Sequence, residues 1–166
     1  NLKHRMIQMK YTLKVLILLF GINANCQDII PFELKEDNRI YLKVSVNQSD
    51  TLNFLFDLGA NITVINKTRL AGNKVDVKFD SVVLNKGTNG ITKEQISIGN
   101  SVRVGNTNYS NTDILGISYS ENDILDGIIG SNLFKNKVIR INYESNELTV
   151  YDKLPKMSET FYVVSE

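Results

Sequence analysis

The sequence predicts an all-β domain, and three features of its 166 residues lead to that prediction. Apolar and polar residues alternate with a period of two in several short segments, as in strands with one buried face. Clusters of Asn, Asp, Ser and Gly separate these segments, as in tight turns. Stretches with helical spacing are scarce. We therefore expect one domain of short strands in a closed or sandwich-like sheet.

The first half of the predicted domain opens with a hairpin. Apolar residues alternate with polar ones through Ile40–Val46, and Thr51–Phe56 has the composition of a returning strand. Asn47–Asp50 lies between them and has the residue types of a turn. β-Branched residues in Ile62–Ile65 predict a further strand, and Lys67–Ala71 is long enough for one helical turn.

The second half is predicted to continue in short strands with one helix. The predicted strands are Val75–Leu84, Gln95–Ile98, Val102–Val104, Val138–Tyr143 and Leu148–Tyr151. Asn85–Gly90 has the composition of a turn between the first two. Ser131–Asn136 is expected to form about two helical turns, with Ser131 as the N-cap.

Composition excludes several classes of protein. Lys and Arg total 19 and Asp and Glu total 18, so the net charge of +1 argues against a nucleic-acid partner held by phosphate contacts. The chain has one Cys and one His. It therefore cannot be a disulfide scaffold, a zinc ribbon or a protein whose metal site needs two His or two Cys ligands.

Residues 1–26 are predicted to be an upstream extension and a signal peptide. Two lysines after Met9 precede the apolar run Val15–Ile22, and small residues then precede Gln27, as at a signal-peptide cleavage site. The run has eight residues, whereas a membrane span needs roughly 20. We expect a secreted or periplasmic protein. Alternatives are a buried N-terminal element and a lipid anchor at Cys26.

The remaining chain contains neither His nor Cys, because His4 and Cys26 both lie in the predicted leader. Catalysis by a Ser-His-Asp triad or a Cys-His pair is therefore excluded.

A carboxylate follows directly on the hydrophobic strand that ends at Phe56. The sequence there is Asp57-Leu58-Gly59-Ala60, with β-branched residues next. Gly59 allows the backbone to turn tightly and to approach a neighbouring segment. Taken alone, this pattern is also typical of an Asx turn that closes a hairpin.

A second motif, Ile128-Ile129-Gly130-Ser131-Asn132-Leu133, lies about seventy residues further along. Together the two segments resemble the retropepsin-like aspartic protease family. Lobes of that family carry Asp-Thr/Ser-Gly-Ala after an apolar strand, and later two hydrophobic residues and a Gly, often followed by x-Asn-Leu. The resemblance covers roughly Ile30 to Asp152.

The resemblance implies a retropepsin-like closed β-barrel lobe over residues 27–152, with a flap hairpin and one short helix after Gly130. It implies Asp57 as a catalytic acid and requires no cofactor or metal. The other site residues that it implies are the active-site loop Leu58, Gly59 and Ala60, the supporting Ile128, Ile129 and Gly130, and the flap tip Gly87, Thr88, Asn89 and Gly90.

In this family two aspartates share a proton, and one of them activates a water that attacks a peptide bond. One lobe supplies one aspartate. The partners implied are therefore a peptide or protein substrate and a second lobe, either a homodimer partner or a lobe in the same chain. Residues 153–166 are interpreted as a linker or the start of that second lobe, and Phe161–Val164 alternatively as an edge strand of this one.

Residue 58 departs from the family pattern, because Leu stands where the family has Thr or Ser. Leu can neither donate nor accept the hydrogen bond by which that hydroxyl braces the two catalytic loops. There are two alternatives to an active protease lobe, and Leu58 favours the first of them. The first is an inactive lobe that binds peptides or supports a partner, and the second is an unrelated β-sandwich for adhesion or ligand capture.

Overall fold

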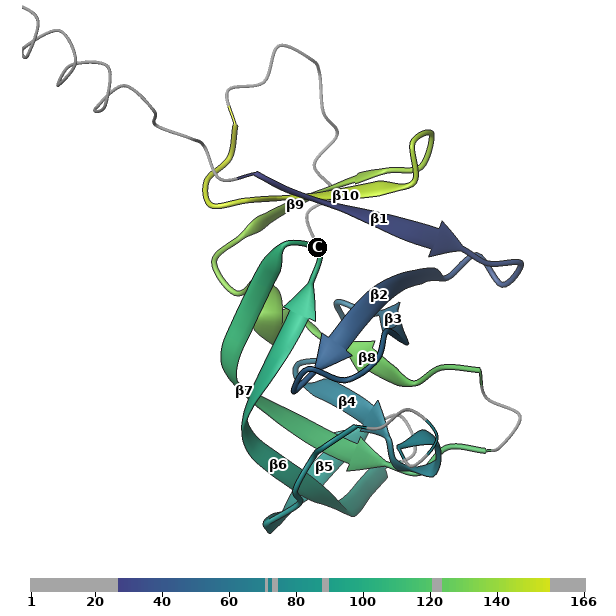
Figure 1. The fold of residues 1–166 in the computed structure, drawn as a ribbon, viewed down its shortest axis with the longest axis vertical. Helices are drawn as coiled ribbons and strands as arrows, with labels where there is room; N and C mark the ends of the chain where they lie inside the picture. The colour runs from purple at the N-terminus through teal and green to yellow at the C-terminus, as the bar shows by residue number, and fades with distance from the viewer. Residues whose placement is uncertain (1–26, 71, 73–74, 88–89, 121–123, 156–166) are drawn as a thin grey trace, which may run out of the picture.

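The computed structural model describes residues 27–70, 72, 75–87, 90–120 and 124–155 (Figure 1). Several predictions fall outside these residues: the signal peptide and Cys26 in residues 1–26, the flap residues Thr88 and Asn89, and the strand at Phe161–Val164. Within the described part, no helix is long and apolar enough to cross a membrane.

The described residues fold into strands and short 3₁₀ helices, which confirms the all-β prediction. The strands are β1 Asp28–Leu34, β2 Ile40–Val46, β3 Leu52–Phe56, β4 Thr63–Asn66, β5 Ser81–Gly87, β6 Gly90–Val104, β7 Thr107–Ile117, β8 Gly127–Ile129, β9 Val138–Asn142 and β10 Glu147–Tyr151. The 3₁₀ helices are η1 Lys67–Arg69 and η3 Ser131–Phe134.

The sheet closes on itself. Its order is β5-β6-β7-β4-β8-β3-β2-β1-β10-β9, and an additional pairing of β6 with β2 completes a ring through β2, β3, β8, β4, β7 and β6. The pairs β3–β8 and β4–β7 are parallel, whereas the other pairs are antiparallel. Figure 1 shows β1, β9 and β10 together at one end of the molecule and the β5–β6 hairpin at the other.

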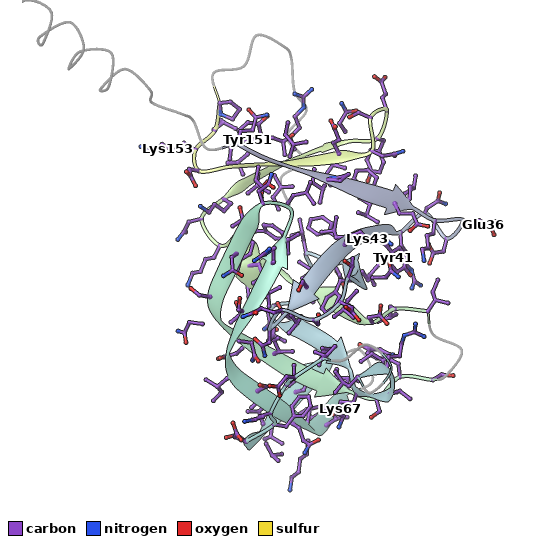
Figure 2. The ribbon with its side chains drawn as sticks, in the orientation of Figure 1. Glu36, Tyr41, Lys43, Lys67, Tyr151 and Lys153 are labelled. Carbon is purple, nitrogen blue, oxygen red and sulfur yellow. The ribbon has the colours of Figure 1, made fainter. Side chains whose placement is uncertain are left out.

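The core fills the ring. Alternate residues of β2 and β3 point into it, and Leu42, Val46 and Phe54 are completely buried there. Burial of this apolar surface is the main force that holds the strands together. Tyr41 and Lys43, labelled in Figure 2, lie on the other face of β2. Lys35 Nζ lies 4.4 Å from the ring centre of Tyr41, and Lys43 donates a hydrogen bond to Asn53.

The sequence analysis did not predict β1, which contains a proline. Residues Asp28–Pro31 pair with β10 and residues Phe32–Leu34 pair with β2, so the strand changes partner directly after Pro31. Proline has no N–H and cannot donate to a ladder. It is tolerated here because the ladder is interrupted at this point in any case.

The predicted strands Gln95–Ile98 and Val102–Val104 are one strand, β6. Its pairing with β7 shifts register between Ser97 and Asn100 and again between Asn100 and Val102. Buried Asn100 fills the irregularity, where its Nδ2 donates to the carbonyl oxygens of Ser97 (3.1 Å) and Thr112 (3.2 Å). Gly99 and Asn100 therefore form a bulge, and the prediction of a break was wrong.

The predicted strand Val75–Leu84 was wrong in its first half, because β5 begins only at Ser81. Val75, Val77 and Phe79 pack against the core and alternate with exposed residues. The period-two pattern is thus real, but residues 75–80 belong to no strand. Periodicity reports which side chains are buried and does not report whether the backbone has a ladder partner.

The predicted helix Ser131–Asn136 is shorter than expected and begins differently. It is the single 3₁₀ turn η3, Gly130 is its N-cap residue, and no side chain caps it. The Ser131 hydroxyl donates instead to Ala60 O at 3.0 Å. This tertiary bond replaces the cap that the sequence predicted.

Two buried polar residues fix the loops around β3, β4 and β8. Asp126 is 5% exposed, and its carboxylate accepts hydrogen bonds from Asn53 N (2.8 Å) and Arg69 Nε (2.5 Å). Asn66 is completely buried, donates to Leu125 O and accepts from Thr68 N. These bonds join the ends of strands that are far apart in sequence.

We expect the Asp126→Ala variant to lower the free energy of unfolding by about 1–3 kcal/mol, because it removes the acceptor of the part-buried Asn53 N–H and the carboxylate that pairs with Arg69 Nε. Urea unfolding followed by circular dichroism measures this loss. The control is Asp152→Ala, since Asp152 is exposed and its hydrogen bond from Lys137 lowers the pKa of Asp152. The control should leave the urea midpoint unchanged, and an equal shift for both variants would contradict the prediction.

Candidate active site

The loop that follows β3 holds Asp57 at the surface of the ring. Asp57 N donates to Ile129 O at 3.0 Å, and Ala60 N donates back to Asp57 O at 3.1 Å. Gly59 N donates to Asp57 Oδ1 at 2.8 Å. The backbone is therefore fixed on both sides of an exposed carboxylate. A carboxylate held in this way can accept further hydrogen bonds on its open side.

The second motif lies directly against this loop. β3 and β8 are parallel with Phe56 opposite Ile129, so the residues that follow the two strands are neighbours. Ser131 N donates to Ala60 O at 2.7 Å. The structure thus brings together Asp57–Ala60 and Ile128–Gly130, the two segments that the sequence analysis singled out.

Gly130 makes this contact possible. A Cβ atom at residue 130 would lie 2.6 Å from Ile62 O and 2.7 Å from Ala60 O, well inside van der Waals contact. Only glycine can occupy this position without displacing backbone. The Gly of the second motif therefore has a packing reason that its sequence position alone does not reveal.

Thr63 and Asn132 form a second link between the two segments. Asn132 Nδ2 lies 3.1 Å from Thr63 Oγ1, which in turn lies 3.2 Å from Asn132 Oδ1. The sequence analysis gave no role to this pair, although Asn132 is part of the second motif and Thr63 follows the first by three residues. Thr63 is completely buried, so this link stiffens the base of the Asp57 loop.

An apolar wall lies beside the loop. Val64, Ile96 and Leu115 are buried together there, and the half-buried side chains that pack against them include Val83 of β5 and Ile128 of β8. Through Val83 the β5–β6 hairpin contacts the same apolar cluster as the second motif. Its last pair is Gly87 opposite Gly90, so these two predicted flap-tip residues do lie at the end of a hairpin.

Leu58 is 47% exposed although it is large and apolar. It lies between the exposed Asp57 and Gly59. The carboxylate and the apolar side chain thus belong to one exposed loop.

In the part of the chain that the structure describes, no three His, Cys, Asp or Glu side chains gather as a possible metal site.

Comparisons with known proteins agree with this geometry. A family model described as "Aspartyl protease" matches residues 42–133, more than half of the chain. The crystal structure of a retropepsin-like aspartic protease from Rickettsia conorii is similar at a TM-score of 0.52 and 22% sequence identity, over 75% of this chain and 90% of that chain. A search among curated proteins found no match. The retropepsin-like fold predicted from the sequence is thereby confirmed, and the chain belongs to the aspartyl protease family.

Proposed function

We propose that this chain is one lobe of an aspartic endopeptidase in which Asp57 provides one of two catalytic carboxylates. The observation that carries the proposal is the position of Asp57. It follows β3, is bonded to Ile129 and Gly59, and lies exposed within the segment that matches the family.

The proposed chemistry follows from the hydrogen bonds of the carboxylate. Gly59 N–H donates a hydrogen bond to Asp57 Oδ1, and no hydrogen bond to Asp57 Oδ2 is found among the described residues. Two carboxylates about 3 Å apart cannot both be ionised, so a second aspartate there would share one proton with Asp57. One carboxylate would then accept a proton from the attacking water, and the other would donate to the peptide carbonyl oxygen.

The second carboxylate has to come from outside this lobe. Asp57 is exposed, and so is the neighbouring Leu58. We propose that a second lobe covers this loop, either in a homodimer or in a longer chain. Leu58 would then become buried between the lobes, as expected because large apolar residues exposed on one protein are commonly covered by a partner.

We propose that the substrate is an extended peptide that lies across the loop and adds a strand beneath the β5–β6 hairpin. The wall that contains Val83 and Ile128 would contact its apolar side chains. Gly87–Gly90 would form the tip of the flap that excludes water. The leader in residues 1–26 and a secreted or periplasmic location remain predictions from the sequence.

The second candidate function is a non-catalytic lobe that binds peptides or supports a partner. Leu58 favours it, because the apolar side chain cannot form the hydrogen bond that the family's Thr or Ser provides. A displacement of the catalytic carboxylate by only about 1 Å can lower the rate of peptide hydrolysis by two orders of magnitude. A catalytic lobe predicts casein cleavage that depends on Asp57, whereas a non-catalytic lobe predicts no cleavage by the unaltered chain.

The Asp57→Asn variant should reduce hydrolysis of fluorescein-labelled casein roughly 10²-fold or more, because it removes the shared proton and the general base. Casein cleavage at acidic to neutral pH, with and without pepstatin, measures this. Asp37→Asn, in the turn between β1 and β2, removes another exposed carboxylate and should leave the rate unchanged. If Asp57→Asn retained the full rate, Asp57 would not be catalytic.

Leu58→Thr and Leu58→Val form a matched pair, because threonine and valine differ in one hydroxyl but have the same shape. If the missing hydroxyl limits this lobe, the Thr variant should cleave casein about tenfold faster than the Val variant, as expected for one added hydrogen bond. Equal rates for the two variants would show that the loop does not depend on a hydroxyl at residue 58.

A further inference from the structure

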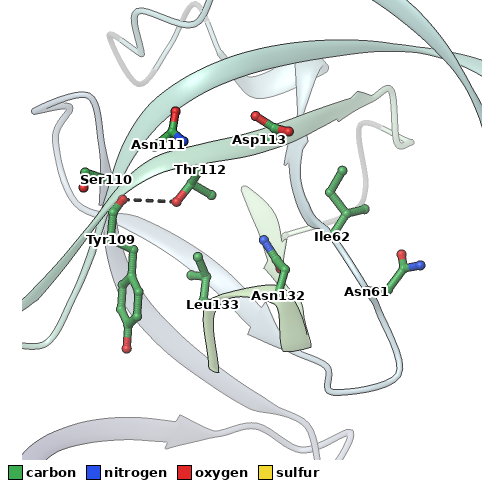
Figure 3. Close-up of a pocket in the computed structure, with 9 residues that line it drawn as sticks. All are labelled: Asn61, Ile62, Tyr109, Ser110, Asn111, Thr112, Asp113, Asn132 and Leu133. Atoms are coloured by element: carbon green, nitrogen blue, oxygen red, sulfur yellow. Dashed lines mark hydrogen bonds between the residues drawn. The ribbon is translucent and has the colours of Figure 1, made fainter. Parts of the chain in front are cut away.

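A pocket of about 560 Å³ lies beside the loop that carries Asp57 (Figure 3). Asn61 and Ile62 form one side of it, β7 forms another, and Asn132 and Leu133 of η3 form the floor. Its volume is within the range of pockets that bind small molecules or single side chains.

The pocket exists because β7 is longer than β4. The two strands pair only from Ile114 onward, where Ile114 lies opposite Thr63. Residues 109–113 of β7 extend past the beginning of β4, and the chain at Asn61 and Ile62 lies apart from them. Asn111 has φ of 56°, a left-handed conformation, and lies where β7 shifts register against β6 between Tyr109 and Thr112.

The lining carries one formal charge, and it is negative. Of the nine lining residues, only Asp113 is charged, and the polar side chains of Asn61, Asn111 and Asn132 supply further oxygen acceptors. Asp113 is exposed, and Gly99 N lies 3.4 Å from its Oδ1. Burial raises the pKa of Tyr109, and so does the charge of Asp28. The Tyr109 phenol therefore stays neutral and adds no charge.

Ile62 connects this pocket to the proposed cleft. It lines the pocket and also packs against the buried cluster of Val64, Ile96 and Leu115, as Ile128 does. Asn61 follows Asp57 by four residues in the same loop. A peptide that lies across Asp57 can therefore pass Ile62 and place one of its side chains in the pocket.

We infer that the pocket binds the lysine or arginine side chain of a peptide substrate, and that Asp113 selects its positive charge. The inference rests on the proposed function, because the peptide in the pocket is the one that lies across Asp57. An ammonium or guanidinium group supplies the donors that this lining accepts.

Other side chains fit the lining less well. A glutamate or aspartate of the substrate would face the carboxylate of Asp113 with no lining cation to offset the repulsion. A leucine or phenylalanine would remove the amides of Asn61 and Asn111 from water without replacing their hydrogen bonds to it, which is unfavourable.

The inference can be tested by titrating the full chain, ¹⁵N-labelled and carrying Asp57→Asn to prevent cleavage, with two acetylated and amidated pentapeptides. Both contain alanine at four positions. One has arginine at its centre and the other has citrulline, which has nearly the same shape without the charge. We expect the arginine peptide to shift the side-chain amide signals of Asn61 and Asn132, and to bind roughly two- to fivefold more tightly than the citrulline peptide.

The Asp113→Asn variant should lose this preference for arginine, whereas Asp37→Asn should keep it. Equal affinities for the two peptides, or shifts confined to residues away from the pocket, would overturn the inference. Because the readout is binding, it does not depend on hydrolysis. A chain that binds arginine selectively but cleaves no casein would refute the proposed activity and leave the pocket assignment intact.

Discussion

The candidate site depends on the absence of a side chain at residue 130. The carbonyl groups of Ala60 and Ile62 occupy the space that a Cβ atom would need. Because they do, Ser131 N reaches Ala60 O at 2.7 Å, and the loop after β3 is bonded to the segment after β8. The position of the Asp57 carboxylate follows from this contact between two loops.

The sequence was informative wherever the evidence is local. The hairpin of β2 and β3 follows from alternation and a turn, and the two motifs identified the segments that meet at the site. β1 was not predicted, and it contains Pro31, which cannot donate to a ladder. β6 was divided because Gly99 resembles a break. The Thr63–Asn132 link and the pocket at Asp113 arise from pairings between distant strands, which no local pattern encodes.

Buried polar side chains position the loops around the site through hydrogen bonds to the backbone. Asn66, Asn100 and Asp126 are buried, and each bonds the backbone of a distant segment. In a low-dielectric interior such bonds are strong when satisfied and costly when broken. The loops around the site are therefore bonded to distant segments, although helix is confined to short 3₁₀ turns in the described residues.

One strand belongs both to the β5–β6 hairpin and to the ring. The outer part of β6 pairs with β5, whereas Val102–Val104 close the ring against β2, and the bulge at Asn100 lies between the two parts. Gln95–Ser97 pair with β7 as well, so they are part of the ring, whereas β6 before Gln95 pairs with β5 alone. A bend of the hairpin that leaves every ring pairing intact is therefore confined to the residues beyond Gln95.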